Sequence, residues 1–154
     1  MSQIVERIGR RHARPVPDEV ALEAPPRGGT LLRVLGAAAV LVVGAVHLEQ
    51  YLAVHFDVVP VIGPLFLLNF IGATVIGFAL LIPLGHRRLP HVLLALAGIG
   101  LAATSFVFLL VSEHRPLFGF QDYGYRPAIV VALAAEAAAV FLLGGYLVGR
   151  LRER

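Results

Sequence analysis

A long apolar run near the start of the chain limits what this sequence can fold into. Residues 30–56 read TLLRVLGAAAVLVVGAVHLEQYLAVHF, with one histidine, His47, set inside the run. A helix needs about 20 mostly apolar residues to cross a bilayer, because each residue adds about 1.5 Å and the hydrocarbon is about 30 Å thick. The run is long enough, so it predicts a membrane-spanning helix.

Three more apolar runs follow, and the predicted spans are residues 31–52, 60–84, 91–111 and 127–148. The 154 residues are 58% hydrophobic, whereas soluble domains are nearer half apolar. We therefore predict an all-α, four-transmembrane-helix bundle over residues 30–154, in contact with the lipid bilayer. All 13 basic residues are arginine, in a chain rich in alanine and glycine, a bias typical of a GC-rich bacterial genome. The predicted location is therefore a bacterial plasma membrane.

The polar parts of the chain predict its orientation. Residues 1–29 are rich in arginine, acidic residues and proline, which predicts a disordered tail. Arginines concentrate in this tail, in the 85–90 link and after residue 148, while the other connections hold only Arg115 and Arg126. The positive-inside rule then places both termini in the cytoplasm. Because the arginines lie at membrane borders, the net charge of +3 does not indicate a nucleic-acid partner.

Polar residues inside the predicted spans lie at one depth. Counted from the outer end of each span at about 1.5 Å per residue, they sit roughly 12–15 Å deep. Small residues at helical spacing share their faces, and such residues let helices approach closely in lipid. We therefore predict an inward-facing polar layer. It consists of His47, Asn69, Thr104, Ser105 and Glu136.

This layer has two interpretations. Hydrogen bonds between helices can fix their register and have no further role, and such bonds are worth only about 0.6 kcal/mol on average. A charged residue near the middle of the membrane, however, costs about 2.5–3.5 kcal/mol on insertion scales. Glutamine or serine would serve a structural role at lower cost, so Glu136 is the residue that most favours a functional interpretation.

A second polar group lies toward the outer ends of the spans. This predicted outer-face cluster contains Gln50, Tyr51, Asp57, Glu113, Asp122 and Tyr123. Imidazole and carboxylate ligands suit zinc, iron, copper or manganese, so a transition-metal site is one alternative. Its candidate ligands are His47, His55, His114 and Glu136. Haem is another, since His55 and His114 could face each other near the surface. No metal-binding spacing motif supports either site, and wet helix ends explain the same residues.

The sequence leaves three functional hypotheses. The leading one is a non-catalytic accessory or partner-binding subunit of a larger membrane complex, or a self-associating protein, because small residues leave helix surfaces able to pack. The first alternative is a metal- or haem-binding redox protein whose site opens outward around His47 and Glu136. The second is a proton or ion relay through Glu136, His47 and Glu49. The chain lacks cysteine, a P-loop and a GxSxG motif, which favours a non-enzyme.

Three stretches resemble a known group of proteins. They are HLEQYLAVHFDVVPVIGPLFLLNFIGA (47–73), PLFGFQD (116–122) and IVVALAAEAAAVFLL (129–143). They are similar to small four-helix membrane proteins of actinobacteria, most of which are carried as hypothetical proteins. The resemblance covers about residues 30–150. It implies a fold and a membrane location, but no mechanism, because no activity is established for the group.

Overall fold

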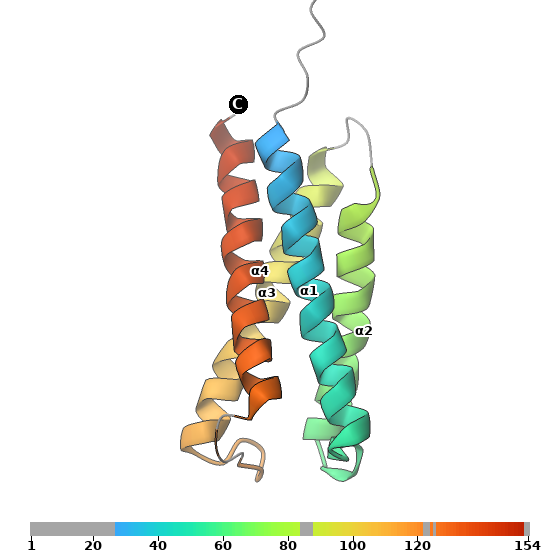
Figure 1. Cartoon of the computed structure of the whole chain (residues 1–154), viewed down its shortest axis with the longest axis vertical. Helices are drawn as coiled ribbons and strands as arrows, with labels where there is room; N and C mark the ends of the chain where they lie inside the picture. The colour runs from blue at the N-terminus through green and yellow to red at the C-terminus, as the bar shows by residue number, and fades with distance from the viewer. Residues whose placement is uncertain (1–26, 84–87, 122–123, 125, 153–154) are drawn as a thin grey trace, which may run out of the picture.

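The computed structural model describes residues 27–83, 88–121, 124 and 126–152 of the chain. Its elements are α1 (Arg27–Ala53), the short 3-10 helix η1 (Phe56–Val58), α2 (Ile62–Leu81), α3 (Arg88–His114) and α4 (Pro127–Arg152). The four α-helices lie side by side and alternate in direction (Figure 1). Each is long and apolar enough to cross a membrane. The predicted all-α four-helix membrane fold is therefore confirmed, and the chain is a multi-pass membrane protein.

The helix ends differ from the predicted spans by a few residues. Residues 27–29, assigned above to the tail, form the first turn of α1, and α3 begins at Arg88 rather than at residue 91. Backbone hydrogen bonding continues a helix past the apolar residues by which a span is recognised. The rest of the predicted tail, residues 1–26, lies outside the described residues.

The turn between α1 and α2 explains why α2 starts later than predicted. His55 and Val61 both have positive φ, 59° and 67°, so the chain reverses through η1 before α2 begins. Gly63 is the second residue of α2 and lies against this turn. A Cβ at this position would lie 2.5 Å from the carbonyl oxygen of Phe56, so only glycine fits against the turn.

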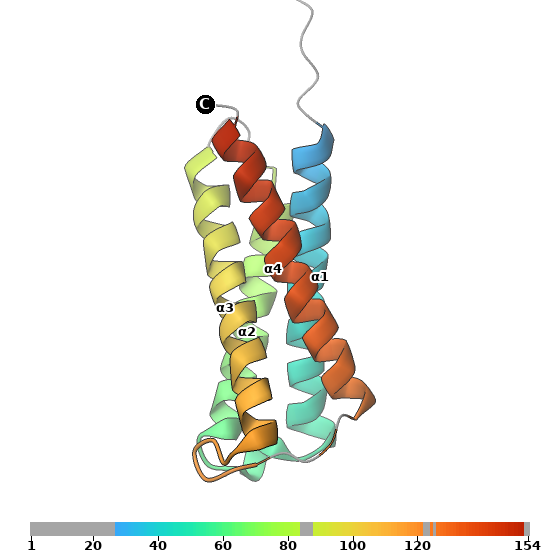
Figure 2. The same cartoon turned by 90° about the vertical axis from the view of Figure 1, so that its left-hand side faces the viewer.

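The bundle has two distinct ends. The start of α1 and the end of α4 lie together at what we call the terminal end, and η1 and residues 115–121 form the opposite loop end (Figure 1). Around the bundle α1 packs between α2 and α4, while α3 closes the ring against α4 and, less extensively, against α2. Figure 2 shows α4 crossing α1 at a clear angle. The cytoplasmic position of the terminal end stays a prediction.

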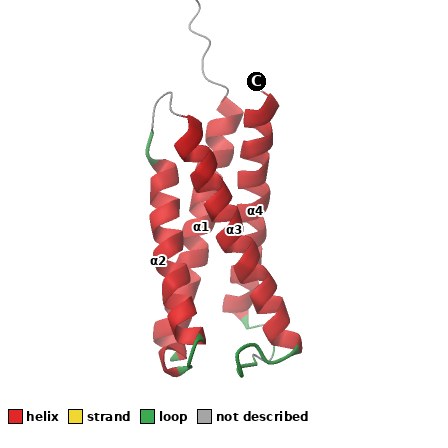
Figure 3. Ribbon diagram, turned by 180° about the vertical axis from the view of Figure 1, so that it is seen from behind, coloured by secondary structure: helices red, strands yellow, loops and turns green. Residues whose placement is uncertain are grey.

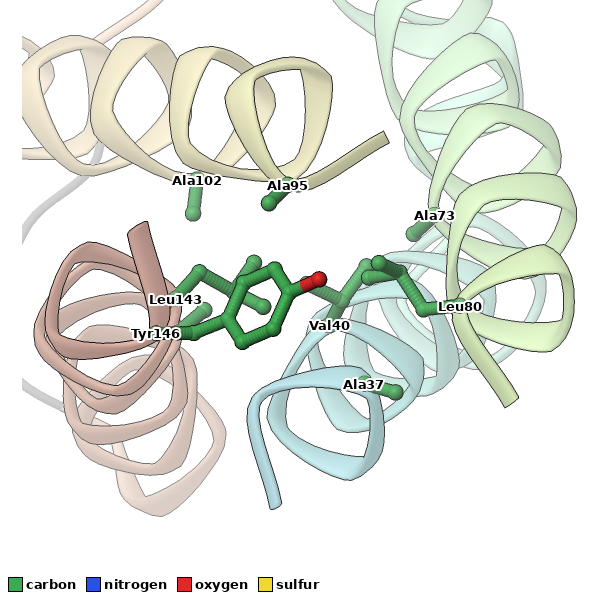
Figure 4. Close-up of a cluster of buried hydrophobic side chains, with 9 residues drawn as sticks. Ala37, Val40, Ala73, Leu80, Ala95, Ala102, Leu143 and Tyr146 are labelled. Carbon is green, nitrogen blue, oxygen red and sulfur yellow. The ribbon is translucent and has the colours of Figure 1, made fainter. Parts of the chain in front are cut away.

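An apolar core fills the half of the bundle toward the terminal end. Side chains from all four helices point into it (Figure 4). Its members are Ala37, Val40, Ala73, Leu80, Ala95, Ala102, Ala139, Leu143 and Tyr146. Most are small, so the helix backbones approach closely, as packing in lipid requires.

The terminal end of α2 is fastened by two side chains. The guanidinium of Arg33 on α1 donates to the carbonyl oxygen of Leu80. His91 on α3 has Nε2 3.0 Å from the carbonyl oxygen of Ile82 and 3.1 Å from the same guanidinium. The last carbonyls of a helix have no partner within the helix, and in lipid they need one. Neighbouring helices supply it here.

Gly44 sets the separation of α1 and α2. A Cβ at this position would lie 2.9 Å from the Cβ of Ala73 and 3.4 Å from the carbonyl oxygen of Phe70. We expect Gly44→Leu to lower the stability of the protein in detergent by about 1–3 kcal/mol, because the helices must separate. Gly144→Leu is the control, since nothing lies within 4 Å of a Cβ there. Thermal unfolding followed by circular dichroism measures both, and equal midpoints for the two variants would contradict the prediction.

Candidate functional site: a pocket beside the polar layer

His47 joins α1 to α3. Its Nδ1 lies 2.8 Å from the carbonyl oxygen of Val43, one turn earlier on the same helix. Its Nε2 lies 3.0 Å from the hydroxyl oxygen of Ser105. A carbonyl oxygen only accepts, so Nδ1 is the donor nitrogen, and Nε2 of the neutral ring accepts from Ser105. The backbone of α1 thereby fixes the tautomer that receives the Ser105 hydrogen bond.

Glu136 lies on α4 beside this pair and is 0% exposed. Neither of its carboxyl oxygens makes a hydrogen bond of normal geometry to the described part of the chain. Ser105 is nevertheless near enough to interact with the carboxyl group. Ser105 therefore stands between the two ionisable side chains of the predicted layer.

A pocket of about 420 Å³ extends from the polar layer toward the loop end. Its walls come from all four helices and include the small or apolar residues Leu65, Leu101 and Ala132. Its polar lining consists of His47, Gln50, Asn69, Thr104, Ser105 and Ser112. No acidic residue and no arginine is among the lining residues in the part of the chain that the structure describes. Glu136 lies behind the wall rather than in it.

Aromatic rings cover the loop end of the pocket. The Phe66 ring packs 4.9 Å from the His47 ring and 5.0 Å from the ring of Phe56 on η1. Phe56 in turn meets Phe120 edge-on at 5.2 Å, with the Arg126 guanidinium 5.8 Å from its ring centre. Backbone hydrogen bonds between Leu117 and Phe120 fix the position of the segment that carries the Phe120 ring. Among the described residues, these rings therefore form the wall of the pocket toward the loop end.

The side of the pocket between α2 and α3 is more open. Leu68 on α2 is 65% exposed, and Gly100, Thr104 and Phe108 on α3 are exposed as well, although all four line the pocket. Seen from behind, α3 moves away from α2 toward the loop end (Figure 3). This lateral opening, defined by these four residues, faces the hydrocarbon of the bilayer.

The structure brings most of the predicted polar layer to this pocket. His47 and Ser105 are in contact, Asn69 and Thr104 line the cavity, and Glu136 adjoins it. Gln50, predicted in the outer-face cluster, is also a buried lining residue. Sequence reasoning missed Ser112, although its place seven residues after Ser105 puts both on one helical face.

The remaining predicted site residues lie elsewhere. His55 is 3.8 Å from Asp57 in an exposed pair at the helix end, a geometry that contributes little. The His114 ring turns back to the carbonyl oxygen of Leu110, 2.8 Å away. Glu113 accepts from the Gly124 amide at 3.2 Å. Tyr51 is only partly buried and does not line the pocket.

The two other members of the predicted outer-face cluster, Asp122 and Tyr123, lie outside the described residues. Within the described ranges no group of three or more histidine and acidic side chains is placed to hold a metal ion. The structure therefore adds no ligand set to the predicted metal or haem site.

No protein-family model, curated protein or solved structure matches the chain. The resemblance to the actinobacterial group therefore stays a prediction.

Proposed function

We propose that this multi-pass membrane protein binds a small amphipathic molecule in the pocket beside His47 and Ser105. The observation that carries this proposal is the cavity itself, which has a volume of about 420 Å³, is mainly apolar, and is lined by polar side chains from three helices. Binding sites for small molecules are typically about 300–1,000 Å³, apolar, and equipped with a few placed polar groups. The pocket has these properties.

Unpartnered polar atoms support this proposal. Gln50 Oε1 and Asn69 Oδ1 are buried without a hydrogen-bond partner in the described part of the chain, and both residues line the pocket. Leaving such an atom unsatisfied costs about 1–3 kcal/mol. The hydrogen bond between His47 and Ser105 is enough to fix helix register, but register alone gives no reason for these two acceptors or for the cavity.

The accessory-subunit hypothesis is compatible with this function and stays the second candidate. A bound molecule can be passed to, or shared with, a larger membrane complex. The outer faces of the helices carry large exposed apolar residues such as Phe141 and Val75. Lipid requires such faces in any case, so they do not by themselves indicate a partner.

The relay hypothesis receives less support. The apolar core cluster fills the bundle between Glu136 and the terminal end. A proton path through that half would need polar groups or water in a region of closely packed alanine and leucine side chains. The described geometry gives Glu136 neighbours on the pocket side, which favours a role linked to the ligand.

Two serine variants test the proposal. We expect Ser105→Ala to weaken binding of oleyl alcohol about tenfold, because the Ser105 oxygen, whose hydrogen is donated to His47, can accept from a ligand hydroxyl and is lost in the variant. Ser112→Ala is the matched control, since that hydroxyl also lines the pocket but donates to the carbonyl oxygen of Leu109 at 2.8 Å. Native mass spectrometry in mild detergent measures the bound fraction during titration. Equal affinities of the wild type and Ser105→Ala would contradict the proposal.

A further inference from the structure

We infer that the ligand is an uncharged lipid with a hydroxyl head, and that it enters sideways from the hydrocarbon between α2 and α3. This inference rests on the proposed function and adds the class of ligand and its route. Three features of the pocket support it: the charge of its walls, the hydrogen-bonding atoms without a partner, and the position of the lateral opening.

The walls of the pocket select against a charged head. Among the described residues that line it there is no aspartate, glutamate or arginine, and the chain has no lysine. Both nitrogens of His47 are already engaged, by Val43 and by Ser105. A phosphate or carboxylate would therefore lose its hydration without meeting a countercharge, which is strongly unfavourable.

The free polar atoms call for a hydrogen-bond donor. The side-chain amide of Gln50 donates through Nε2 to the Glu49 carboxylate, which fixes its orientation and leaves Oε1 as an acceptor. Asn69 Oδ1 is a second buried acceptor without a partner in the described part of the chain. Both oxygens are covered, so a ligand donor meets either of them when its side chain turns toward the cavity. A hydroxyl group donates one hydrogen bond and can accept another from a neighbouring side chain. A ketone, an ester or an ether cannot donate to either acceptor.

The route follows from which sides of the pocket are covered. Among the described residues, the rings of Phe56, Phe66 and Phe120 cover the loop end, the side from which a water-soluble ligand would arrive. The lateral opening lies between α2 and α3, which are both long and apolar enough to span a membrane, so lipid tails border it. A cavity of about 420 Å³ takes a head group and the first part of a chain, so the rest of a long tail would pass through the opening into the bilayer. Gly100 lies in this opening, with nothing within 4 Å of a Cβ there.

Three probes with the same 18-carbon chain test the ligand class: oleyl alcohol, its methyl ether and oleate. Titrations use the full chain in neutral detergent with native mass spectrometry as the readout. We expect the alcohol to bind at least about tenfold more tightly than the ether, which lacks the donor, and than oleate, which carries a charge. Oleate binding as tightly as the alcohol would overturn the uncharged class, and the ether doing so would overturn the need for a donor.

A pair of glycine variants tests the route. Gly100→Trp places a large ring in the lateral opening and is expected to weaken oleyl alcohol binding about tenfold or more. Gly144→Trp is the control, because it also has open space at Cβ but lies on α4 away from the pocket. Leu68→Trp on the α2 side of the opening is a second blocking variant. Thermal unfolding of each variant confirms that it is folded before binding is compared.

The outcomes separate this inference from the proposed function. Unchanged binding in both folded Gly100→Trp and folded Leu68→Trp, with binding still reduced in Ser105→Ala, would overturn lateral entry and leave the pocket as the binding site. Absence of binding by all three probes to the wild type would overturn the uncharged-lipid assignment. Molecules that co-purify with the protein give a second comparison. If the wild type and Ser105→Ala carry the same ones in the same amounts, the pocket does not hold them, and the proposed function fails as well.

Discussion

Replacing Leu143 by alanine is expected to destabilise the bundle by about 2–3 kcal/mol. Leu143 is 0% exposed, and its side chain occupies the space opposite two glycines: a Cβ at Gly36 would lie 2.5 Å, and one at Gly98 2.9 Å, from its methyl carbons. Three helices therefore meet on this one side chain. This loss of stability lies toward the lower end of the range for buried leucine. In lipid, the cavity and the lost van der Waals contacts lower stability, but no free energy of transfer from water is lost.

Phe141 provides the control for this prediction. It lies two residues earlier on the same helix but is 79% exposed, so Phe141→Ala removes a larger side chain that only lipid or detergent contacts. We expect its stability to stay within about 0.5 kcal/mol of the wild type. Unfolding by a denaturing detergent, titrated into the mild one, measures both variants. A loss for Phe141→Ala as large as for Leu143→Ala would show that burial in this bundle does not determine stability.

Replacing Glu136 by methionine is expected to raise stability by about 2–3 kcal/mol. The carboxyl group is fully buried and makes no hydrogen bond of normal geometry to the described residues, so it loses hydration with little return. A charged side chain near the middle of a membrane costs about that much on insertion scales. Methionine has a similar length, is unbranched, and fills irregular spaces without polar atoms.

Glu136→Gln separates the carboxyl group from polarity in general. The amide keeps two polar atoms in the same place but carries no charge, so we expect its stability to lie between those of the wild type and of Glu136→Met. The unfolding titration used for Leu143 applies here too. A methionine variant less stable than the wild type would mean that Glu136 has a stabilising partner, and its main role would then be structural. A more stable variant that binds oleyl alcohol less well would indicate a residue kept for the ligand.

The length and depth of the helices follow from the sequence because lipid imposes them. Four apolar runs give four helices, and counting residues from the span ends places His47 and Ser105 at one height. The structure has these two side chains in a hydrogen bond across α1 and α3. A count along each helix is one-dimensional, however. It fixes height, but it does not fix how far apart two helices stand at that height.

The pocket therefore escapes sequence reasoning. It depends on α3 moving away from α2 and on Phe56 meeting Phe120, which follow from helix packing and from the reversed backbone at His55 and Val61. The predicted metal ligands show the same limit. His55 and His114 lie near the same bundle end in sequence terms, yet the first pairs with Asp57 and the second folds back on its own helix. Side-chain direction at a helix end is set by local partners that depth does not reveal.

The attachment of α2 by Arg33 and His91 fixes this helix at one end, while Gly63 and Phe66 pack it against η1 at the other. The fixed end lies at the terminal end of the bundle, while the opposite end borders the pocket and the sparser contact with α3. A ligand that separates α2 from α3 would therefore rotate α2 about its attachment at the terminal end. The largest displacement would occur at η1 and the aromatic rings beside it. Binding of a ligand in the pocket would then change the structure at the membrane surface.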